Sequence, residues 1–274
     1  MKDKESYFIS LFQNEFIGDD GAVIDESVYS SDLFCEDIHF KREWMSLKEI
    51  AYKSMLVNIS DAIVMNAKPR YALLNIKLPK NFTTKEMNQL SSGFKEASKE
   101  YNIDIIGGDT VAGGALDISI TIISHTTKPT KRDTLNLGDI VGFTGELGSV
   151  GVDLSHLLNG KKIDKNSKFI KPTLRSEFFY KAASNFTSAM DISDGLSKDL
   201  SRLSTINGVG FEFFKKLDPT ALCSGEEYEV LFSCDEKDLD TIKKIAKQTN
   251  TTVTFFAKAI EGSYESICKE NHFE

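Results

Sequence analysis

The stretch SMLVNISDAIVMNA, residues 54–67, constrains the fold of this chain more than any other segment. Its apolar residues wrap most of a helix, and a helix that is apolar nearly all round must lie buried among other elements. Ser46-x-x-Glu49, just before it, has the form of a capping box and marks a helix start. We therefore expect a buried helix that runs to about Ala67 and ends before Pro69.

Strand and helix patterns alternate along the rest of the chain. Apolar residues occupy every second position near the end of 71–78 and again at 118–122, and Thr83-x-x-Glu86 predicts a second capped helix between these strands. In the second half we expect helices after Gly148, after Asp194 and at 235–247, and strands at 140–143, 209–214, 228–232 and 252–256. This alternation predicts an α/β (α+β) protein with two domains, 1–135 and 136–274.

Composition excludes some classes of protein. The 274 residues are 41% hydrophobic and 27% charged, which is typical of a globular chain. The net charge of −8 disfavours nucleic acid as a partner, because phosphates are bound by basic surfaces. No segment is apolar enough for a membrane span or an export signal, so we expect a cytoplasmic protein. In that compartment Cys35, Cys223, Cys234 and Cys268 are expected to be reduced thiols.

Five acidic segments carry the candidate chemistry, since the chain has no GxxxxGK[ST] loop, no kinase-type glycine loop and no HRD motif. Each alone has an ordinary alternative, such as a turn or a helix N-cap. Together they offer many carboxylate oxygens, the ligands that Mg²⁺ prefers. The segments are Gly18-Asp19-Asp20-Gly21-Ala22, Ser30-Ser31-Asp32 with Glu36-Asp37-Ile38-His39-Phe40, Asn58-Ile59-Ser60-Asp61, Gly107-Gly108-Asp109-Thr110, and Asp191-Ile192-Ser193-Asp194-Gly195-Leu196.

Asp61 and Asp109 are the two aspartates whose setting can be argued individually. Asp61 lies in the apolar helix, where an unpaired carboxylate is costly, so it needs either a cation or a basic partner. Lys53, two turns away, is the alternative partner; we favour a metal ion. Asp109 follows a strand at 104–106 through two glycines, which permits a close approach of backbone to phosphate or, alternatively, a tight turn.

The chain resembles the thiamine-monophosphate kinase family over about residues 17 to 232. The resemblance lies in the order and the residue identities of these five segments and of Gly225-Glu226-Glu227-Tyr228-Glu229. That family is related to aminoimidazole ribonucleotide synthetase, selenophosphate synthetase and a hydrogenase maturation factor. The resemblance implies a two-domain synthetase-like fold whose N-terminal mixed sheet, with its helices, pairs with its twin in a homodimer. It implies ATP as co-substrate, thiamine monophosphate as acceptor and several Mg²⁺ ions. No general base is expected, because the acceptor phosphate is already ionised near neutral pH.

The resemblance also implies roles for individual residues. The substrate contacts would be His39 and Glu226. The ATP contacts would be Tyr101, Gly108, Asp109, Arg132 and Ser193. The metal ligands would be Asp20, Ser30, Ser31, Asp32, Asp61, Asp109, Asp191 and Asp194.

The chain departs from the family pattern in several places. Glu36-Asp37 replaces the usual Glu-Gly, Asn66 replaces a glycine and Glu227 replaces an aspartate. The C-terminus CKENHFE lacks the aromatic residue that stacks on thiamine in the family; Glu270 occupies the nearest position, and Phe273 is a substitute. Two alternatives stay open: another ATP-using enzyme of the superfamily, such as aminoimidazole ribonucleotide synthetase, and a non-catalytic ATP-binding homologue.

Overall fold

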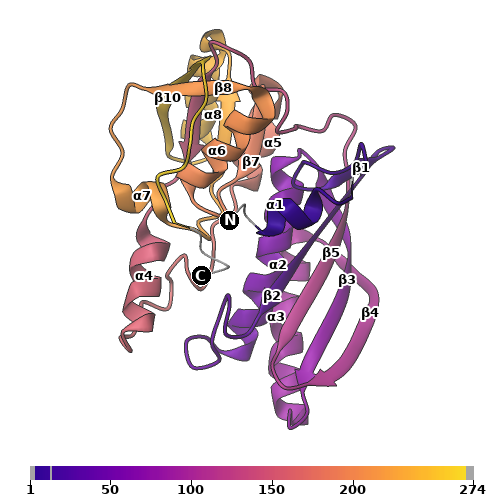
Figure 1. Ribbon diagram of the computed structural model, residues 1–274. Coiled ribbons are helices and arrows are strands. Elements are labelled where there is room, and N and C mark those ends of the chain that lie inside the picture. Colours follow the sequence, from indigo (N-terminus) through magenta and orange to yellow (C-terminus); the bar gives the residue numbers. More distant parts are fainter. Residues whose placement is uncertain (1–3, 13, 270–274) are drawn as a thin grey trace.

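The computed structural model describes residues 4–12 and 14–269 and contains two five-stranded sheets with helices packed against them (Figure 1). The first half of the chain forms α1 (Lys4–Ile9), β1 (Ala22–Ile24), β2 (Ser27–Cys35), α2 (Leu47–Val64), β3 (Lys68–Pro79), α3 (Thr84–Tyr101), β4 (Asp104–Gly113) and β5 (Asp117–His125). The second half forms β6 (Ile140–Thr144), α4 (Ser149–Leu158), α5 (Ser176–Ala182), β7 (Ser188–Asp191), α6 (Leu196–Asn207), β8 (Val209–Phe213), α7 (Pro219–Cys223), β9 (Val230–Cys234), α8 (Leu239–Gln248) and β10 (Val253–Glu261).

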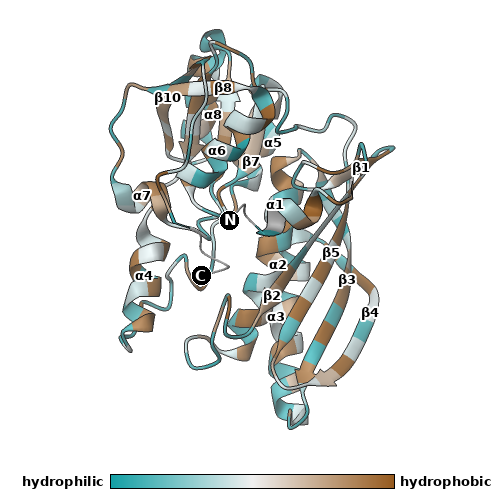
Figure 2. Cartoon of the chain, in the orientation of Figure 1, coloured by the Kyte–Doolittle hydropathy of each residue, from teal (hydrophilic) through white to brown (hydrophobic). Residues whose placement is uncertain are grey.

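The first sheet is mixed and has the strand order β1-β2-β5-β3-β4. Only β3 and β4 pair in parallel among its strands, and β4 is an edge strand because it comes last in this order. Buried and half-buried residues alternate along β5, so alternate side chains face the helices, and Figure 2 shows the matching alternation of polar and apolar residues on the strands. Helices α2 and α3 cover one face of this sheet (Figure 1).

Helix α2 is buried on nearly all sides, as the sequence predicts. Its N-cap Ser46 and Glu49 form the expected capping box, and every residue from Ile50 to Val64 is buried. It packs on β2 and β5 of the first sheet and also contacts β7 and α5 of the second half. This helix therefore lies between the two halves of the molecule, and its polar side chains face a boundary rather than solvent.

The second sheet has the strand order β7-β9-β6-β10-β8 and is antiparallel. Its strands carry a core of aromatic and aliphatic residues, among them Phe232, Leu231 and Phe256. The connection between β5 and β6 contains the predicted domain bound at 135/136, which stays a prediction. Among the described helices none is long and apolar enough to cross a membrane. The mixed α/β class is confirmed.

Two expectations from the sequence are wrong. The strand that begins at Asp104 does not end before the two glycines but continues to Gly113. Gly108 is needed there because its φ is +137° and an added Cβ would lie 1.6 Å from the Leu74 carbonyl oxygen of β3. Cys223 and Cys268 form a disulfide, with Cα atoms 5.5 Å apart, so only Cys35 and Cys234 are free among the described cysteines.

Candidate active site

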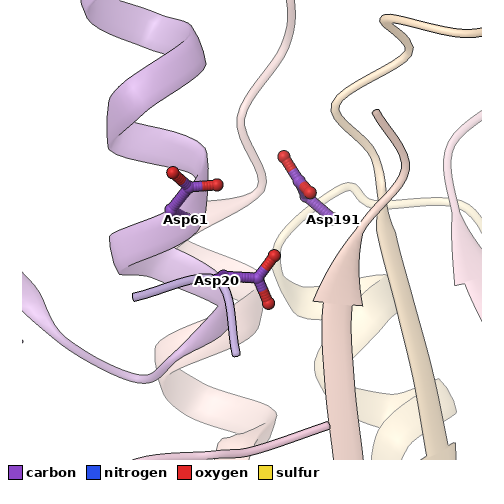
Figure 3. Close-up of side chains that lie close together, drawn as sticks. All are labelled: Asp20, Asp61 and Asp191. Atoms are coloured by element: carbon purple, nitrogen blue, oxygen red, sulfur yellow. The ribbon is translucent and has the colours of Figure 1, made fainter. Parts of the chain in front are cut away.

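Three carboxylates from distant parts of the chain meet beside α2. Asp20 comes from the loop before β1, Asp61 from the last turns of α2 and Asp191 from the end of β7, and all three point into one space (Figure 3). An oxygen from each lies within 4.8 Å of an oxygen from the other two. The structure thus joins residues of three of the acidic segments.

The loop that carries Asp20 is held by close packing and by Arg132. An added Cβ on Gly21 would lie 2.9 Å from the Tyr29 carbonyl oxygen, so only glycine fits there. The Arg132 guanidinium donates two hydrogen bonds to the Asp20 carboxylate, one of them 3.0 Å long from Nε. The Arg132 backbone N–H donates to Asp19 Oδ1 at 2.7 Å, which fixes the same loop.

Asp61 and Asp191 are buried with too little positive charge around them. Burial first, and then the negative charges of Asp32, Asp191 and Asp20, raise the pKa of Asp61 well above its usual value. Burial and the charge of Asp20 likewise raise the pKa of Asp191 to about 7, against a hydrogen bond from Ser60 Oγ at 2.5 Å and the charge of Arg132. Lys53, the alternative partner for Asp61, bonds to Glu226 instead.

Strand β2 brings the next acidic segment to the same helix. Ser30 and Asp32 face α2: Ser30 Oγ donates to the Asn58 carbonyl oxygen at 3.3 Å, and Asn58 Oδ1 accepts from the Asp32 N–H at 2.8 Å. Asp32 adds negative charge around Asp61 and Asp191. Ser31, one residue along, points to the opposite face, where its hydroxyl donates to the Ile120 carbonyl oxygen at 3.1 Å. The three residues therefore do not share one environment.

The segment after Asp191 connects the cluster to the Glu226 loop. The Ser193 carbonyl oxygen accepts from the Glu226 N–H at 2.7 Å. Asp194 pairs with Arg202, its Oδ2 lying 2.9 Å from Nη2. Asp199, in the first turn of α6, is completely buried, and no described group bonds its Oδ2.

A chain of contacts through Phe34 and Lys53 connects His39 and Glu226, the two predicted substrate contacts. The His39 ring stacks on Phe34, with ring centroids 5.4 Å apart, and Nδ1 accepts from the Cys35 N–H. Lys53 Nζ lies 5.6 Å from the centre of the Phe34 ring and 2.5 Å from Glu226 Oε2. The structure thus groups these two residues through Phe34 and Lys53.

Other predicted contacts lie elsewhere in the molecule. Asp109 is exposed on the edge strand β4, where its own Oδ1 accepts from the Thr110 N–H, and Gly108 is explained by its packing on β3. Tyr101, at the end of α3, is half-buried, and burial followed by the charge of Glu100 raises the pKa of its hydroxyl. Glu270 and Phe273 lie outside the described residues.

Sequence analysis missed three residues around this site. For Lys53 the sequence suggests only a pairing with Asp61, and Asp199 lies just beyond the acidic segment 191–196. Tyr228 lies within the segment Gly225–Glu229, where no local pattern indicates a role for it. Burial, and then the charges of Glu226, Asp32, Asp191 and Asp61, raise the pKa of its hydroxyl well above the usual value.

A cavity of about 300 Å³ adjoins the Asp20 loop. Phe16, Gly18, Asp19 and Lys131 contribute to its lining. Burial is the main reason that the pKa of Asp19 rises to about 6, with Asp20 adding to it. Lys131 thus shares the lining with the acidic residues Glu15, Asp19 and Asp133, and the cavity adjoins the loop that also carries Asp20.

Comparisons with known proteins identify the family. Residues 18–126 match the model of the AIR synthase related protein, N-terminal domain. The thiamine-monophosphate kinase of Nitrosopumilus maritimus is 33% identical over 83% of this chain and 79% of the relative. The thiamine-monophosphate kinase of Leptospira interrogans is 30% identical over 98% of both chains. The chain belongs to the thiamine-monophosphate kinase family.

The family match includes both halves of the molecule. The Leptospira kinase aligns over nearly the whole chain, and so does the solved structure described as AaThiL complexed with AMPPCP and TMP. That structure superposes with a TM-score of 0.88 at 23% sequence identity and covers 100% of this chain and 99% of its own. The thiamine-monophosphate kinase fold therefore extends through the second sheet, which contributes Asp191.

Proposed function

We propose that this protein transfers the γ-phosphoryl group of ATP to the phosphate of thiamine monophosphate, forming thiamine diphosphate. Membership of the thiamine-monophosphate kinase family supports the reaction. The observation that carries the assignment to a site is the meeting of Asp20, Asp61 and Asp191, three buried or half-buried carboxylates from three separate segments.

The cluster fits magnesium ions on its own chemistry. The three side chains offer only oxygen ligands, which Mg²⁺ prefers. A bound cation would also offset the repulsion that raises the pKa values of Asp61 and Asp191. We propose that Asp20, Asp61 and Asp191 hold Mg²⁺, with Ser30, Asp32 and Asp194 nearby. The ions would neutralise charge on the donor and acceptor phosphates.

The surroundings of α2 support a site in which the phosphoryl donor binds near one end of this helix and the acceptor near the other. An added Cβ on Gly21 would lie 3.3 Å from Met65 Sδ, so the Asp20 loop and its cavity lie at the C-terminal end of the helix. The Lys53–Glu226 pair lies toward the N-terminal end. We propose that ATP enters beside the cavity, with Arg132 and Ser193 near its phosphates, and that the organic part of the acceptor lies near His39 and Glu226.

The chain's own residues then have binding and orienting roles rather than proton transfer. The attacking oxygen belongs to a phosphate that is ionised near neutral pH, so no side chain has to remove a proton. Arg132 fixes the Asp20 carboxylate, and Ser60 does the same for Asp191. These contacts hold the carboxylates in place before substrate binds, which lowers the reorganisation needed in the reaction.

We also propose a homodimer through the first sheet, which would make 1–135 the dimerisation half. Strand β4 is an exposed edge that carries Ile105, Ile106 and Val111. Unprotected apolar edges of this kind favour pairing with another chain. In that dimer Tyr101, Gly108 and Asp109 are proposed to complete the nucleotide site. Light scattering coupled to size-exclusion chromatography tests the assembly, and a monomer at micromolar concentration contradicts it.

The function is tested with purified protein, Mg²⁺, ATP and thiamine monophosphate, by following ADP and thiamine diphosphate chromatographically. We expect equal amounts of the two products. ADP release that requires a purine intermediate instead would assign the protein to the aminoimidazole ribonucleotide synthetase branch. Binding of ATP without turnover of either acceptor would indicate a non-catalytic homologue.

A further inference from the structure

Lys53 is a lysine in the interior of the molecule with a single ionic partner among the described residues. Lys53 belongs to α2 and its side chain is completely buried, with Nζ 2.5 Å from Glu226 Oε2. Two aromatic rings flank the ammonium group, with Nζ 4.2 Å from the centre of the Phe169 ring and 5.6 Å from that of Phe34. A buried ion pair of this kind adds little net stability, because both charged groups lose their water, so the pair needs an explanation beyond packing.

The partner belongs to a loop whose backbone is held in an uncommon conformation. Glu226 has φ +54° and Tyr228 has φ +51°, in the left-handed region that non-glycine residues rarely occupy. Two hydrogen bonds tie this loop to the segment after Asp191: Glu226 N–H to the Ser193 carbonyl oxygen at 2.7 Å, and Tyr228 N–H to the Ile192 carbonyl oxygen at 2.9 Å. Strained backbone of this kind concentrates at functional sites.

We propose that Lys53 is a positioning residue that fixes the Glu226 carboxylate at the acceptor end of the site. One oxygen of Glu226 is taken by Lys53, while the side chain remains 20% exposed and can use its other oxygen on a ligand. This inference rests on the proposed function, because it assigns a direction to the acceptor. A carboxylate at that end suits an acceptor whose organic part carries positive charge, as the thiazolium ring of thiamine does.

The helix sets the distance between the two ends of the acceptor. Lys53 and Asp61 are eight residues apart on α2, which corresponds to roughly 12 Å along the helix axis. Ser60 bonds Asp191 at one end, and Lys53 bonds Glu226 at the other. One rigid element thus connects the carboxylate cluster to the acceptor-binding carboxylate, across the boundary between the two halves.

The nearby negative charges explain why Glu226 needs a fixed cation. The Glu226 N–H bonds the carbonyl oxygen of Ser193, two residues after Asp191, so Glu226 belongs to a loop that adjoins the acidic cluster. Without Lys53, repulsion from the cluster would displace the Glu226 side chain. Lys53 would also keep Glu226 from acting as an additional metal ligand.

The test compares three variants with wild-type protein: Lys53→Met, Lys53→Arg and Glu226→Gln, together with the Lys53→Met/Glu226→Gln double variant. For Lys53→Met we expect the KM for thiamine monophosphate to rise about tenfold or more, with kcat and the KM for ATP changed by less than about threefold. Lys53→Arg keeps the charge and should restore most of the acceptor affinity. Thermal unfolding of each variant is measured alongside.

The double variant separates positioning from packing. If Lys53 acts through Glu226, the double variant should raise the acceptor KM no further than the more affected single variant, because both changes remove one interaction. Additive effects, or an unchanged acceptor KM in Lys53→Met, would overturn the proposal, as would failure of both Lys53 variants to fold. Wild-type protein that forms no thiamine diphosphate would instead contradict the proposed function.

Discussion

Two groups of buried carboxylates in this molecule differ in how much positive charge and how many hydrogen-bond donors surround them. Glu227 and Glu229, in the loop before β9, have no exposed side-chain surface and are saturated with donors. Asp61 and Asp191 are also buried, yet the charges nearest to them are mostly other carboxylates. The molecule therefore neutralises one acidic group internally and leaves the other short of positive charge.

The donors around Glu229 show what internal neutralisation requires. Arg175 donates to both carboxylate oxygens at 2.8 Å, Thr144 Oγ1 donates at 2.7 Å, and Lys168 Nζ lies 3.2 Å away. Glu227 in turn accepts from the Gly148 N–H at 2.7 Å, at the start of α4. These bonds connect α4, α5 and β6 to the β9 loop, so this group stabilises the second half of the molecule.

Asp61 has no such support. In the part of the chain that the structure describes, no group donates a hydrogen bond to its carboxylate, although it is only 9% exposed. A buried carboxylate in that position either protonates or requires an external cation. We infer from this difference that missing internal compensation, rather than burial alone, makes Asp61 a candidate metal ligand.

The largest expected effect is on catalysis. Asp61→Asn keeps the shape of the side chain and removes one negative charge from the cluster, so we expect kcat to fall on the order of 100-fold or more. The same change should raise the free energy of unfolding without metal by at least about 1 kcal/mol, because a repelled buried charge is gone. Steady-state kinetics and thermal unfolding in EDTA measure the two effects.

Asp139→Asn is the matched control for that experiment. Asp139 is 6% exposed, and its Oδ2 accepts hydrogen bonds from the Asn136 N–H and from Thr187. Asp139→Asn should lower stability and leave kcat near the wild-type value. If Asp61→Asn behaved as Asp139→Asn does, Asp61 would be a structural residue and the cluster would not be the site.

Glu229→Gln tests the compensated group. We expect the free energy of unfolding to fall by about 2–3 kcal/mol, since Arg175 and Lys168 lose a shared partner. That figure lies below the range for fully buried pairs because these side chains are 21% and 19% exposed. Stabilisation by Mg²⁺ should be unchanged. Denaturant titrations with and without Mg²⁺ measure both quantities, and a lost Mg²⁺ response would place Glu229 in the metal site.

The sequence predicts the buried helix that carries Asp61, but it does not predict which groups compensate the buried charges. The capping box at Ser46 and the apolar pattern of residues 54–67 predict α2 and its burial, because both are local signals. The identity of the partner of Lys53 depends on a loop 173 residues away, and no local pattern encodes that contact. Asp199 was missed for the same reason, since its burial depends on tertiary packing.

The two wrong expectations have physical causes as well. Glycines commonly end strands, but Gly108 lies inside β4 because the neighbouring strand approaches too closely for any side chain. The pairing of Cys223 with Cys268 joins residues 45 positions apart, and spacing alone gives no sign of it. The strand end is expected from a local preference of glycine and the reduced thiols from the expected compartment, and neither signal reports which groups meet in the folded chain.

A smaller effect is expected in the pH dependence of magnesium binding. The folded-state pKa of Asp191 is raised from 3.8 to about 7, so without metal the folded protein holds an extra proton between these values. Stability without metal therefore falls as pH rises through this window. Mg²⁺ must displace that proton, so its stabilising effect should be larger at pH 8 than at pH 6, by about 1–2 kcal/mol.

Thermal unfolding at each pH and at fixed ionic strength, without MgCl₂ and with about 10 mM MgCl₂, measures this difference. Asp191→Asn should remove most of it, whereas Glu229→Gln should not. A Mg²⁺ effect that is equal at both pH values would mean that the ion does not replace the Asp191 proton, and the cluster would then have to be compensated in another way.

The smallest predicted effect concerns Asp32, which lies beside the cluster rather than within its closest trio. ATP brings its own Mg²⁺, yet Asp20, Asp61 and Asp191 with Asp32 offer more negative charge than one ion offsets. We therefore expect the rate to rise with free Mg²⁺ after ATP is fully complexed, and to rise more steeply than a single-site curve. Asp32→Asn should flatten that dependence and raise the half-saturating Mg²⁺ concentration about threefold, a change of roughly 0.6 kcal/mol. Titration of MgCl₂ at constant Mg·ATP and ionic strength measures it. A plateau reached as soon as ATP is complexed would show that the nucleotide-borne ion suffices, and the uncompensated charge of this cluster would then serve to hold that single ion.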